Sequence, residues 1–170
     1  PILSLFSFLY KKDNVGFTLQ FDDAPSEPIE IAHRTGAPSY KADVNVNEPN
    51  ISTLDSGYQL IEVPLEAIAW GRSGDKGNKA NIGIIARHPN LLPYIWDTFS
   101  EEKIVEIFSH FLENDKIDRH YLPGISGVNY VLHDVLGGGG TTSLRNDPQG
   151  KGYAQILLSC KISVPKNLLV

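Results

Sequence analysis

The chain has 170 residues, of which 41% are hydrophobic and 21% charged, and its formal net charge at pH 7 is −5. This length suits one domain of ordinary size with a packed core. An acidic chain without a basic stripe is poorly suited to bind phosphate backbones, so we expect no nucleic-acid partner. The single cysteine, Cys160, excludes an internal disulfide and a cysteine-based zinc site, and the cytoplasm is the simplest localisation.

The N-terminal residues are predicted to lie outside the main domain. Ile2–Leu9 and Val15–Phe21 are β-prone runs on either side of a turn-like segment, and we expect them to pair as a hairpin. The first run is too short to span a membrane and lacks the basic segment of a secretory signal, so no membrane association is expected. Residues 23–56 contain recurrent prolines, which predict an extended connector with one short strand near Tyr40–Val46. A start at Pro1 and the absence of methionine suggest a fragment or subunit of something larger.

From residue 57 onward, the hydrophobic pattern predicts alternating strands and helices. Tyr58–Trp70 alternates like a half-buried strand, and a bulge is expected near Glu66, where the apolar parity changes. Ala80–Ala86 is predicted to pair with this strand in antiparallel fashion. The later pattern predicts helices over 90–98 and 101–112, a hairpin of 117–122 with 127–136, a helix over 150–159 and a strand over 160–164.

The hairpin of 117–122 with 127–136 has a register that follows from its turn. With Gly124 and Ile125 at the centre, Ile117 faces Leu132 on the core side of the sheet. The opposite face then carries Asp118, His120, Asn129, Val131 and His133. His120 and His133 are four residues out of register, so no metal site is expected there, and no cofactor is predicted for the chain.

The stretch Ala69–Gly83 places Arg, Ser, Asp, Lys and Asn between two apolar runs, and it is interpreted as a polar loop between two strands. Arg72, Lys76 and Lys79 can hold a carboxylate or phosphate, with Asp75 as a general base or as the orienting partner of a lysine. Ser73 can act as a nucleophile only if a histidine or lysine lies beside it. The alternative is a structural loop whose Asp75 accepts backbone N–H bonds, and the residue types alone leave both readings open.

A second unusual stretch consists of four consecutive glycines, Gly137–Gly140, followed by Thr141, Thr142, Ser143 and Arg145. Successive glycine amides can point at one spot and bind an anion. The nucleotide-binding fingerprints are absent, since neither a Gly-Lys-Ser/Thr ending nor a following helix pattern is present. A tightly turning connector is the alternative explanation.

The two stretches resemble the motifs of one known family. They are similar to the C-terminal domain of AtuA-type proteins, the acyclic terpene utilisation family. The first match is residues 71–87, which begin Gly-Arg-Ser-Gly-Asp-Lys-Gly-Asn-Lys-Ala-Asn-Ile-Gly. The second is residues 129–145, with Asp147, Gln149, Gly150 and Lys151 after them. The resemblance covers about residues 58–165. It implies an α+β fold for residues 57–165, with a ferredoxin-like antiparallel sheet and helices packed on one face, preceded by a β-hairpin and the extended connector of residues 23–56. It also implies that residues 1–22 are the end of a larger N-terminal domain.

The family takes its name from the bacterial breakdown of citronellol and geraniol through acyl-CoA intermediates, and no family catalytic residue is carried over. The resemblance implies an accessory or substrate-binding domain that packs on a larger AtuA-type domain or subunit, or on copies of itself, and shares a site for an acyl-CoA or branched carboxylate. One alternative is a lyase, hydratase or hydrolase with Asp75 as base, and a second is an oligomerisation module. The candidate catalytic residues are Asp75 and Lys76, and the candidate binding residues are Arg72, Ser73, Asn81, His133, Gly138, Gly139, Gly140, Thr141 and Arg145.

Overall fold

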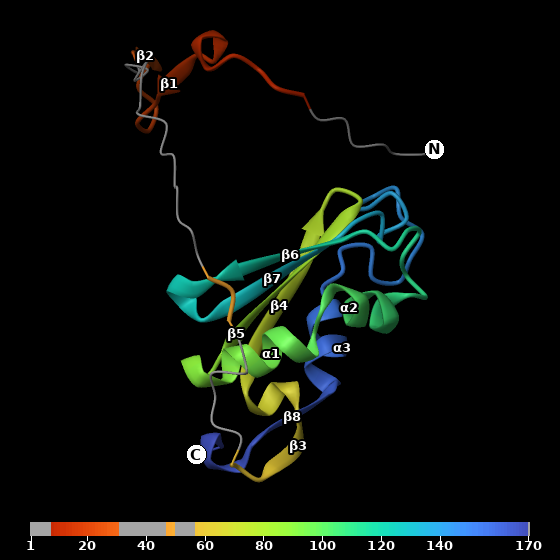
Figure 1. Ribbon diagram of the computed structural model, residues 1–170. Helices are drawn as coiled ribbons and strands as arrows, with labels where there is room; N and C mark the ends of the chain where they lie inside the picture. Colours follow the sequence, from red (N-terminus) through yellow and green to blue (C-terminus); the bar gives the residue numbers. More distant parts are fainter. Residues whose placement is uncertain (1–7, 31–46, 50–56, 170) are drawn as a thin grey trace. The chain divides into compact units, whose positions relative to one another are not determined.

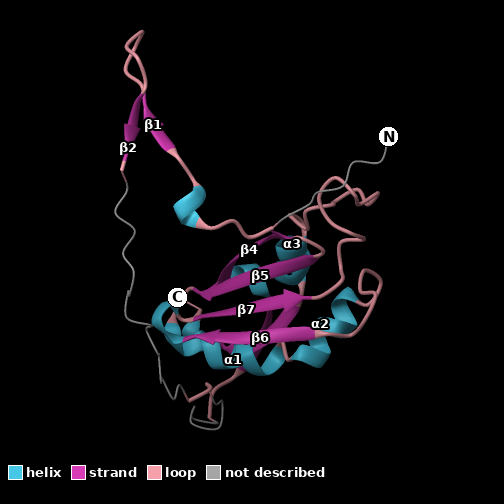
Figure 2. Ribbon diagram, turned by 90° about the horizontal axis from the view of Figure 1, so that it is seen from above, coloured by secondary structure: helices cyan, strands magenta, loops and turns pink. Residues whose placement is uncertain are grey.

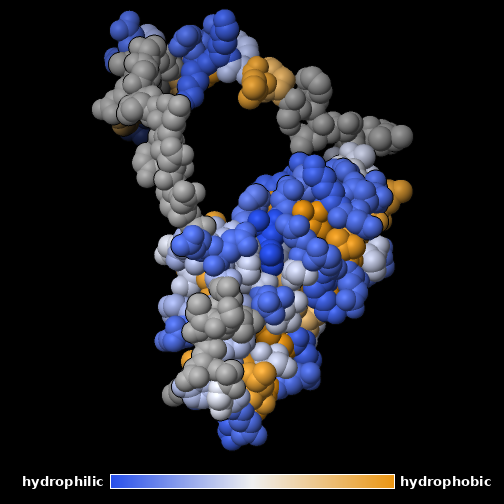
Figure 3. Space-filling view, viewed as in Figure 1, coloured by the Kyte–Doolittle hydropathy of each residue, from blue (hydrophilic) through white to orange (hydrophobic). Residues whose placement is uncertain are grey.

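A computed structural model describes residues 8–30, 47–49 and 57–169 of the chain. Of the described residues, 8–30 belong to one compact unit, and 47–49 and 57–169 belong to a second, larger one. In the space-filling view of Figure 3, the larger unit has scattered hydrophobic patches within a mostly hydrophilic surface. In the described parts of the chain, no helix reaches the length and apolar character that crossing a bilayer requires.

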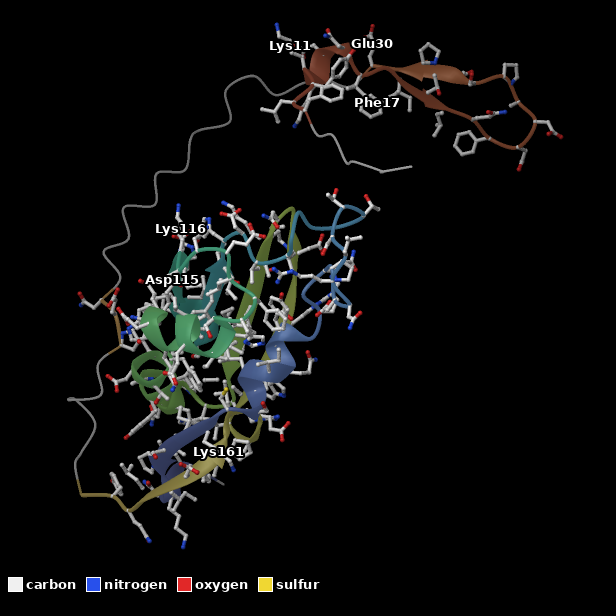
Figure 4. All side chains as sticks on the ribbon, turned by 90° about the vertical axis from the view of Figure 1, so that its right-hand side faces the viewer. Lys11, Phe17, Glu30, Asp115, Lys116 and Lys161 are labelled. Atoms are coloured by element: carbon white, nitrogen blue, oxygen red, sulfur yellow. The ribbon has the colours of Figure 1, made fainter. Side chains whose placement is uncertain are left out.

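The smaller unit contains a short hairpin. Strand β1 (Phe17–Leu19) pairs antiparallel with β2 (Glu27–Ile29), and every described residue of this unit is exposed. Figure 4 labels Phe17 on this hairpin. Among the described residues, the partner of β1 is β2, which lies within the range expected to be an extended connector. Residues 2–7 of the run Ile2–Leu9 and the strand expected near 40–46 lie outside the described residues.

The larger unit is built on a four-stranded antiparallel sheet with the order β4-β5-β7-β6. Two further strands, β3 and β8, form a separate antiparallel pair at one end of the unit (Figure 1). The strands are β3 (Leu60–Pro64), β4 (Ala69–Lys76), β5 (Lys79–Ala86), β6 (Ile117–Leu122), β7 (Gly127–Leu132) and β8 (Lys161–Pro165).

Three helices pack on one face of the four-stranded sheet: α1 (Leu92–Thr98), α2 (Glu101–Phe108) and α3 (Tyr153–Ser159). Helix α2 begins after Ser100, whose Oγ accepts a hydrogen bond from the backbone N–H of Lys103 at 3.3 Å, as expected for an N-cap. The helix buries Ile104 and Phe108 completely. The predicted α+β class, with helices on one face of an antiparallel sheet, is confirmed.

The core lies between these helices and the inward side of the sheet. Ile117 pairs with Leu132, as the turn of this hairpin predicted, and both side chains are buried. The predicted pairing of Arg119 with Tyr130 is also confirmed. Fully buried side chains on the central strands β5 and β7 are Ala80, Ile82, Ile84, Val128, Tyr130 and Leu132. These residues alternate along each strand, because successive side chains point to opposite faces of a sheet.

Two predictions about the first part of this unit were wrong. Tyr58–Trp70 is not one strand with a bulge, because a 3₁₀ turn over Leu65–Ala67 separates β3 from β4. This turn, and not a bulge near Glu66, explains the change of apolar parity. Strand β3 consequently pairs with β8, and only the end of the predicted strand, from Ala69 onward, pairs with β5.

Ala69–Gly83 is likewise not a loop. Strands β4 and β5 pair along their whole length up to Lys76 and Lys79, and only Gly77 and Asn78 form the turn. Gly77 has a φ of 70°, which suits the first central position of a two-residue hairpin turn. The polar residues occur within a strand because β4 is at the edge of the sheet and alternate residues of it face solvent.

Candidate functional site

The face of the sheet opposite the helices is open among the described residues (Figure 2). At one end it carries four exposed apolar side chains. Trp70 on β4 pairs with Ile85 on β5, and these side chains are 55% and 39% exposed. Leu122 on β6 and Ile125 in the following turn are 37% and 53% exposed. A contiguous apolar surface of this kind on an open sheet face indicates a place where a ligand or another protein surface binds.

These four apolar residues line a slot of about 250 Å³, together with Arg72, Gly83 and the neighbouring strand residues. Gly83 on β5 pairs with Arg72 on β4. A Cβ atom added at Gly83 would lie 3.8 Å from the carbonyl oxygen of Arg72 and 3.9 Å from Oδ1 of Asn129, which are ordinary contact distances. The space above Gly83 is therefore open, and the absence of a side chain there keeps the slot accessible.

Two polar pairs lie farther along the same face. Asn81 Nδ2 donates to Asn129 Oδ1 at 3.1 Å, which links β5 to β7. His133 is only 7% exposed, and its Nε2 lies 2.6 Å from Asp118 Oδ2. The hydrogen bond from His133 is the main cause that lowers the pKa of the Asp118 carboxyl below its ordinary value. The carboxylate of Asp118 thus already binds Nε2 of His133. Arg72, another candidate with a basic side chain on this face, lies at the slot.

The two candidate catalytic residues do not converge. Asp75 and Lys76 are neighbours on β4, so their side chains point to opposite faces of the sheet. Asp75 Oδ1 lies 3.6 Å from Nζ of Lys151, in the segment before α3. Lys76 Nζ donates to the backbone carbonyl of Asp75 at 2.9 Å. This geometry gives no site at which both side chains contact one substrate.

Ser73 is structural in this arrangement. It is 5% exposed, and its Oγ donates to the carbonyl of Lys151 at 3.0 Å and accepts from the backbone N–H of Ala154 at 2.9 Å. The hydroxyl therefore attaches the start of α3 to the edge strand β4. Because both bonds are internal to the fold, the hydroxyl is not poised as a nucleophile.

The glycine-rich segment packs directly on the β4–β5 turn. Asn78 Oδ1 accepts from the N–H of Gly138 at 2.7 Å, and Asn78 Nδ2 donates to Asp134 Oδ1 at 3.1 Å. Gly139 donates its N–H to the carbonyl of Leu136 at 3.3 Å. Two of the amides expected to bind an anion are therefore already used. The two unusual stretches therefore do contact each other, through hydrogen bonds between Asn78 and the segment of Asp134 and Gly138.

The last candidates lie at the margin of this junction. Arg145 Nη1 donates to the carbonyls of Phe111 and Val135 at 3.0 and 2.7 Å, which connects the end of α2 to the start of the glycine-rich segment. Gly140, with a φ of 49°, borders open space, and Thr141 is exposed. Arg145 thus stabilises the fold, and the structure brings none of these three residues to the slot on the open face.

The sequence model of the AtuA ferredoxin-like domain matches residues 63–163.

The chain belongs to this family.

No match was found among curated proteins or among solved structures. The matched region of the AtuA ferredoxin-like domain runs from the end of β3 to β8, and its order of strand, helices, two strands, helix and strand from β5 to β8 is the ferredoxin-like pattern. The resemblance inferred from the sequence is therefore confirmed.

Several residues that organise this AtuA-like domain were not among the candidates. Asp147 accepts from the backbone N–H groups of Lys151 and Gly152 at 2.9 and 2.8 Å, and so fixes the turn that precedes α3. Asn78 and Asp134 connect the β4–β5 turn to the end of β7. The Gly-Asn pair was a usable signal for Asn78, because Gly-Asn is a two-residue hairpin turn sequence. No group of three metal-ligating residues occurs within the described ranges.

Proposed function

We propose that this AtuA-like domain is an accessory, substrate-binding domain whose open sheet face binds a branched apolar chain that carries a carboxylate. The observation that carries the proposal is the slot beside Arg72, on the face that no helix covers among the described residues. Apolar side chains and an adjacent guanidinium are the features that recognise an amphipathic anion.

The size of the slot limits the ligand. Its volume of about 250 Å³ is below the roughly 300–1,000 Å³ of pockets that enclose drug-sized ligands. It therefore suits a short branched alkyl chain and not the nucleotide of coenzyme A. Trp70 and Ile125 offer the largest exposed apolar surfaces, and contact with them stabilises an alkyl group by about 25 cal/mol per Å² removed from water.

Charge supports an anionic ligand. Arg72 is exposed at the slot, and Lys76 and Lys79 point to the same face of the sheet farther along the β4–β5 hairpin, next to its turn, although the chain has a net charge of −5. A local excess of positive charge raises the concentration of anions near the face. A guanidinium also pairs with a carboxylate through two parallel N–H bonds, which orients the ligand as well as attracting it.

An accessory role is favoured over an independent enzyme because Asp75 and Lys76 point to opposite faces and Ser73 is bonded within the fold. The apolar end of the open face also suits packing against a larger AtuA-type domain or subunit, or a second copy, which would close the slot around its ligand. In this proposal the domain acts in the cytoplasm in the catabolism of acyclic terpenes or branched acyl-CoA compounds.

The proposal is tested by titrating the chain with citronellate and isovalerate while recording two-dimensional amide NMR spectra. We expect binding on the order of millimolar for ligands of this size, with shifts at Gly83, Ile85 and Asn129. A Cβ atom at Gly83 meets no backbone atom closer than 3.8 Å, so Gly83→Val is expected to fill the slot and abolish the shifts while the fold remains. Arg72→Gln is expected to weaken citronellate binding about tenfold, through the loss of a charge-assisted hydrogen bond.

Lys79→Gln is the matched control, because it removes a cation from the same hairpin without touching the slot. It is expected to leave the citronellate affinity within about twofold of the unmodified chain. Binding that survives Gly83→Val, or that is lost equally in Lys79→Gln and Arg72→Gln, would show that the slot is not the site.

A further inference from the structure

A second concavity lies near the C-terminal end of the described chain. One of its lining residues, Val63, belongs to β3, which pairs with β8 at one end of the larger unit (Figure 1). The concavity has a volume of about 610 Å³, within the range of ligand-binding pockets. Its apolar lining comes from Val63, Ala67, Ile68, Leu91, Leu168 and Leu169, and its polar lining from Arg87, His88 and Asn167. We call it the C-terminal groove.

Arg87 provides a positioned cation at this groove. Its Nη2 donates to the carbonyl of Glu66 at 3.1 Å, and its guanidinium carbon lies 4.6 Å from the centre of the Trp70 ring. These two contacts hold the planar group in place. A guanidinium has five N–H donors, so the bond to Glu66 leaves others for a ligand.

His88 adds a second donor of defined position. Its Nδ1 accepts a hydrogen bond from the backbone N–H of Asn90 at 3.3 Å. An Nδ1 atom that accepts carries no proton, so in the neutral ring the proton is on Nε2. With the bond from Asn90 in place, His88 therefore presents an N–H donor at Nε2. The groove thus combines an apolar lining with two N–H donors, and none of its described lining residues carries a carboxylate side chain.

We propose that the C-terminal groove is a second ligand site, distinct from the slot, and that it takes an alkyl carboxylate. The carboxylate pairs with Arg87 and His88, and the alkyl chain lies along Ile68, Leu91 and Leu168. A carboxylate is favoured over a neutral head group because Arg87 and His88 both donate N–H hydrogen bonds and Arg87 is positively charged. The larger volume accommodates a longer unbranched chain than the slot does. This site does not depend on the proposed function of the slot.

The test is a titration with octanoate, followed by two-dimensional amide NMR. Shifts are expected at Arg87, His88 and Leu91. Ala67 is exposed and lines the groove, so Ala67→Phe fills it and is expected to weaken octanoate binding at least tenfold. Ala67→Ser, which changes the same position without filling the groove, is expected to bind like the unmodified chain. Arg87→Gln is expected to weaken binding about tenfold.

The outcomes separate this site from the slot. Loss of octanoate shifts in Ala67→Phe, with retention in Ala67→Ser and Gly83→Val, supports the groove. Octanoate binding that disappears in Gly83→Val but persists in Ala67→Phe overturns it, as does an absence of shifts at the groove residues. If Arg87→Gln impairs folding through its contacts with Glu66 and Trp70, the two variants at Ala67 still decide the question.

Discussion

Substituting Gly139 by alanine is the most direct test of why four glycines follow one another. Gly139 has a φ of 71°, and a Cβ atom there would lie 2.7 Å from the carbonyl carbon of Gly77 and 3.2 Å from the backbone nitrogen of Asn78. Real Cβ atoms do not approach a backbone carbon that closely, so the glycine-rich segment and the β4–β5 turn would have to separate. The matched control is Gly140→Ala, which has a similar φ of 49° but borders open space.

The size of the effect follows from two contributions. An alanine in the left-handed region costs about 1–2 kcal/mol, and this cost applies to both variants. Forcing extra volume into a packed position costs about 1–3 kcal/mol, and this cost applies only to Gly139→Ala. We therefore expect Gly139→Ala to lower the free energy of unfolding by about 2–5 kcal/mol, and Gly140→Ala by about 1–2 kcal/mol.

Urea denaturation followed by tryptophan fluorescence measures both values. With a denaturant slope of about 2 kcal/mol per molar, the extra cost at Gly139 corresponds to a midpoint lower by about 0.5–1.5 M than that of Gly140→Ala. Equal midpoints for the two variants would refute the close packing of Gly139 on Gly77. The anion-binding explanation of the glycine-rich segment would then regain support.

Two further predictions concern single hydrogen-bonded side chains. Ser73→Ala leaves the buried N–H of Ala154 without its partner, so we expect the free energy of unfolding measured by urea denaturation to fall by about 1–3 kcal/mol. The control is Ser159→Ala, at an exposed helix serine, which is expected to lower it by less than about 0.5 kcal/mol. Equal losses in the two variants would contradict the structural role of Ser73. The hydrogen bond from His133 lowers the pKa of the Asp118 carboxyl in the folded state. The stability that this bond contributes is therefore fully present above the pKa that Asp118 has in the unfolded chain, and it is lost as the pH falls through the pKa of the folded state. Asp118→Asn is accordingly expected to be destabilising near neutral pH and progressively less so as the pH falls below the ordinary carboxyl pKa, and a destabilisation that stays constant with pH would contradict this account.

The register of the β6–β7 hairpin was predictable from the sequence because its side-chain pattern and its turn agree. Alternation places Ile117 and Tyr121 on one side of β6 and Asp118 on the other, and the short turn allows little choice of pairing. The cap at Ser100 was predictable for a similar reason, since a serine followed by two acidic residues and an apolar periodicity is a local signal.

The sequence predicted a polar loop where β4 and β5 pair, because residue type and residue environment conflict there. Polar residues in succession are typical of loops, but β4 is an edge strand that faces solvent on one side and receives α3 on the other. Ser73 and Asp75 face the α3 side, where Lys151 supplies their partners. Those partners lie more than seventy positions away in the sequence. No local pattern could therefore have shown that these polar side chains belong to a strand.

Some residues of the two motifs hold the fold together and do not line the slot. Asn78, Asp134 and Gly139 belong to the two motifs that carry the resemblance, and they contact backbone atoms, each other and the side chain of Asn114. They hold the β4–β5 turn against the end of β7, which sets how the open face is presented. Leu122 and Ile125, which line the slot, lie outside both motifs. Changes at these two positions would alter the shape of the slot without disturbing that junction, so a common framework can present different ligand surfaces.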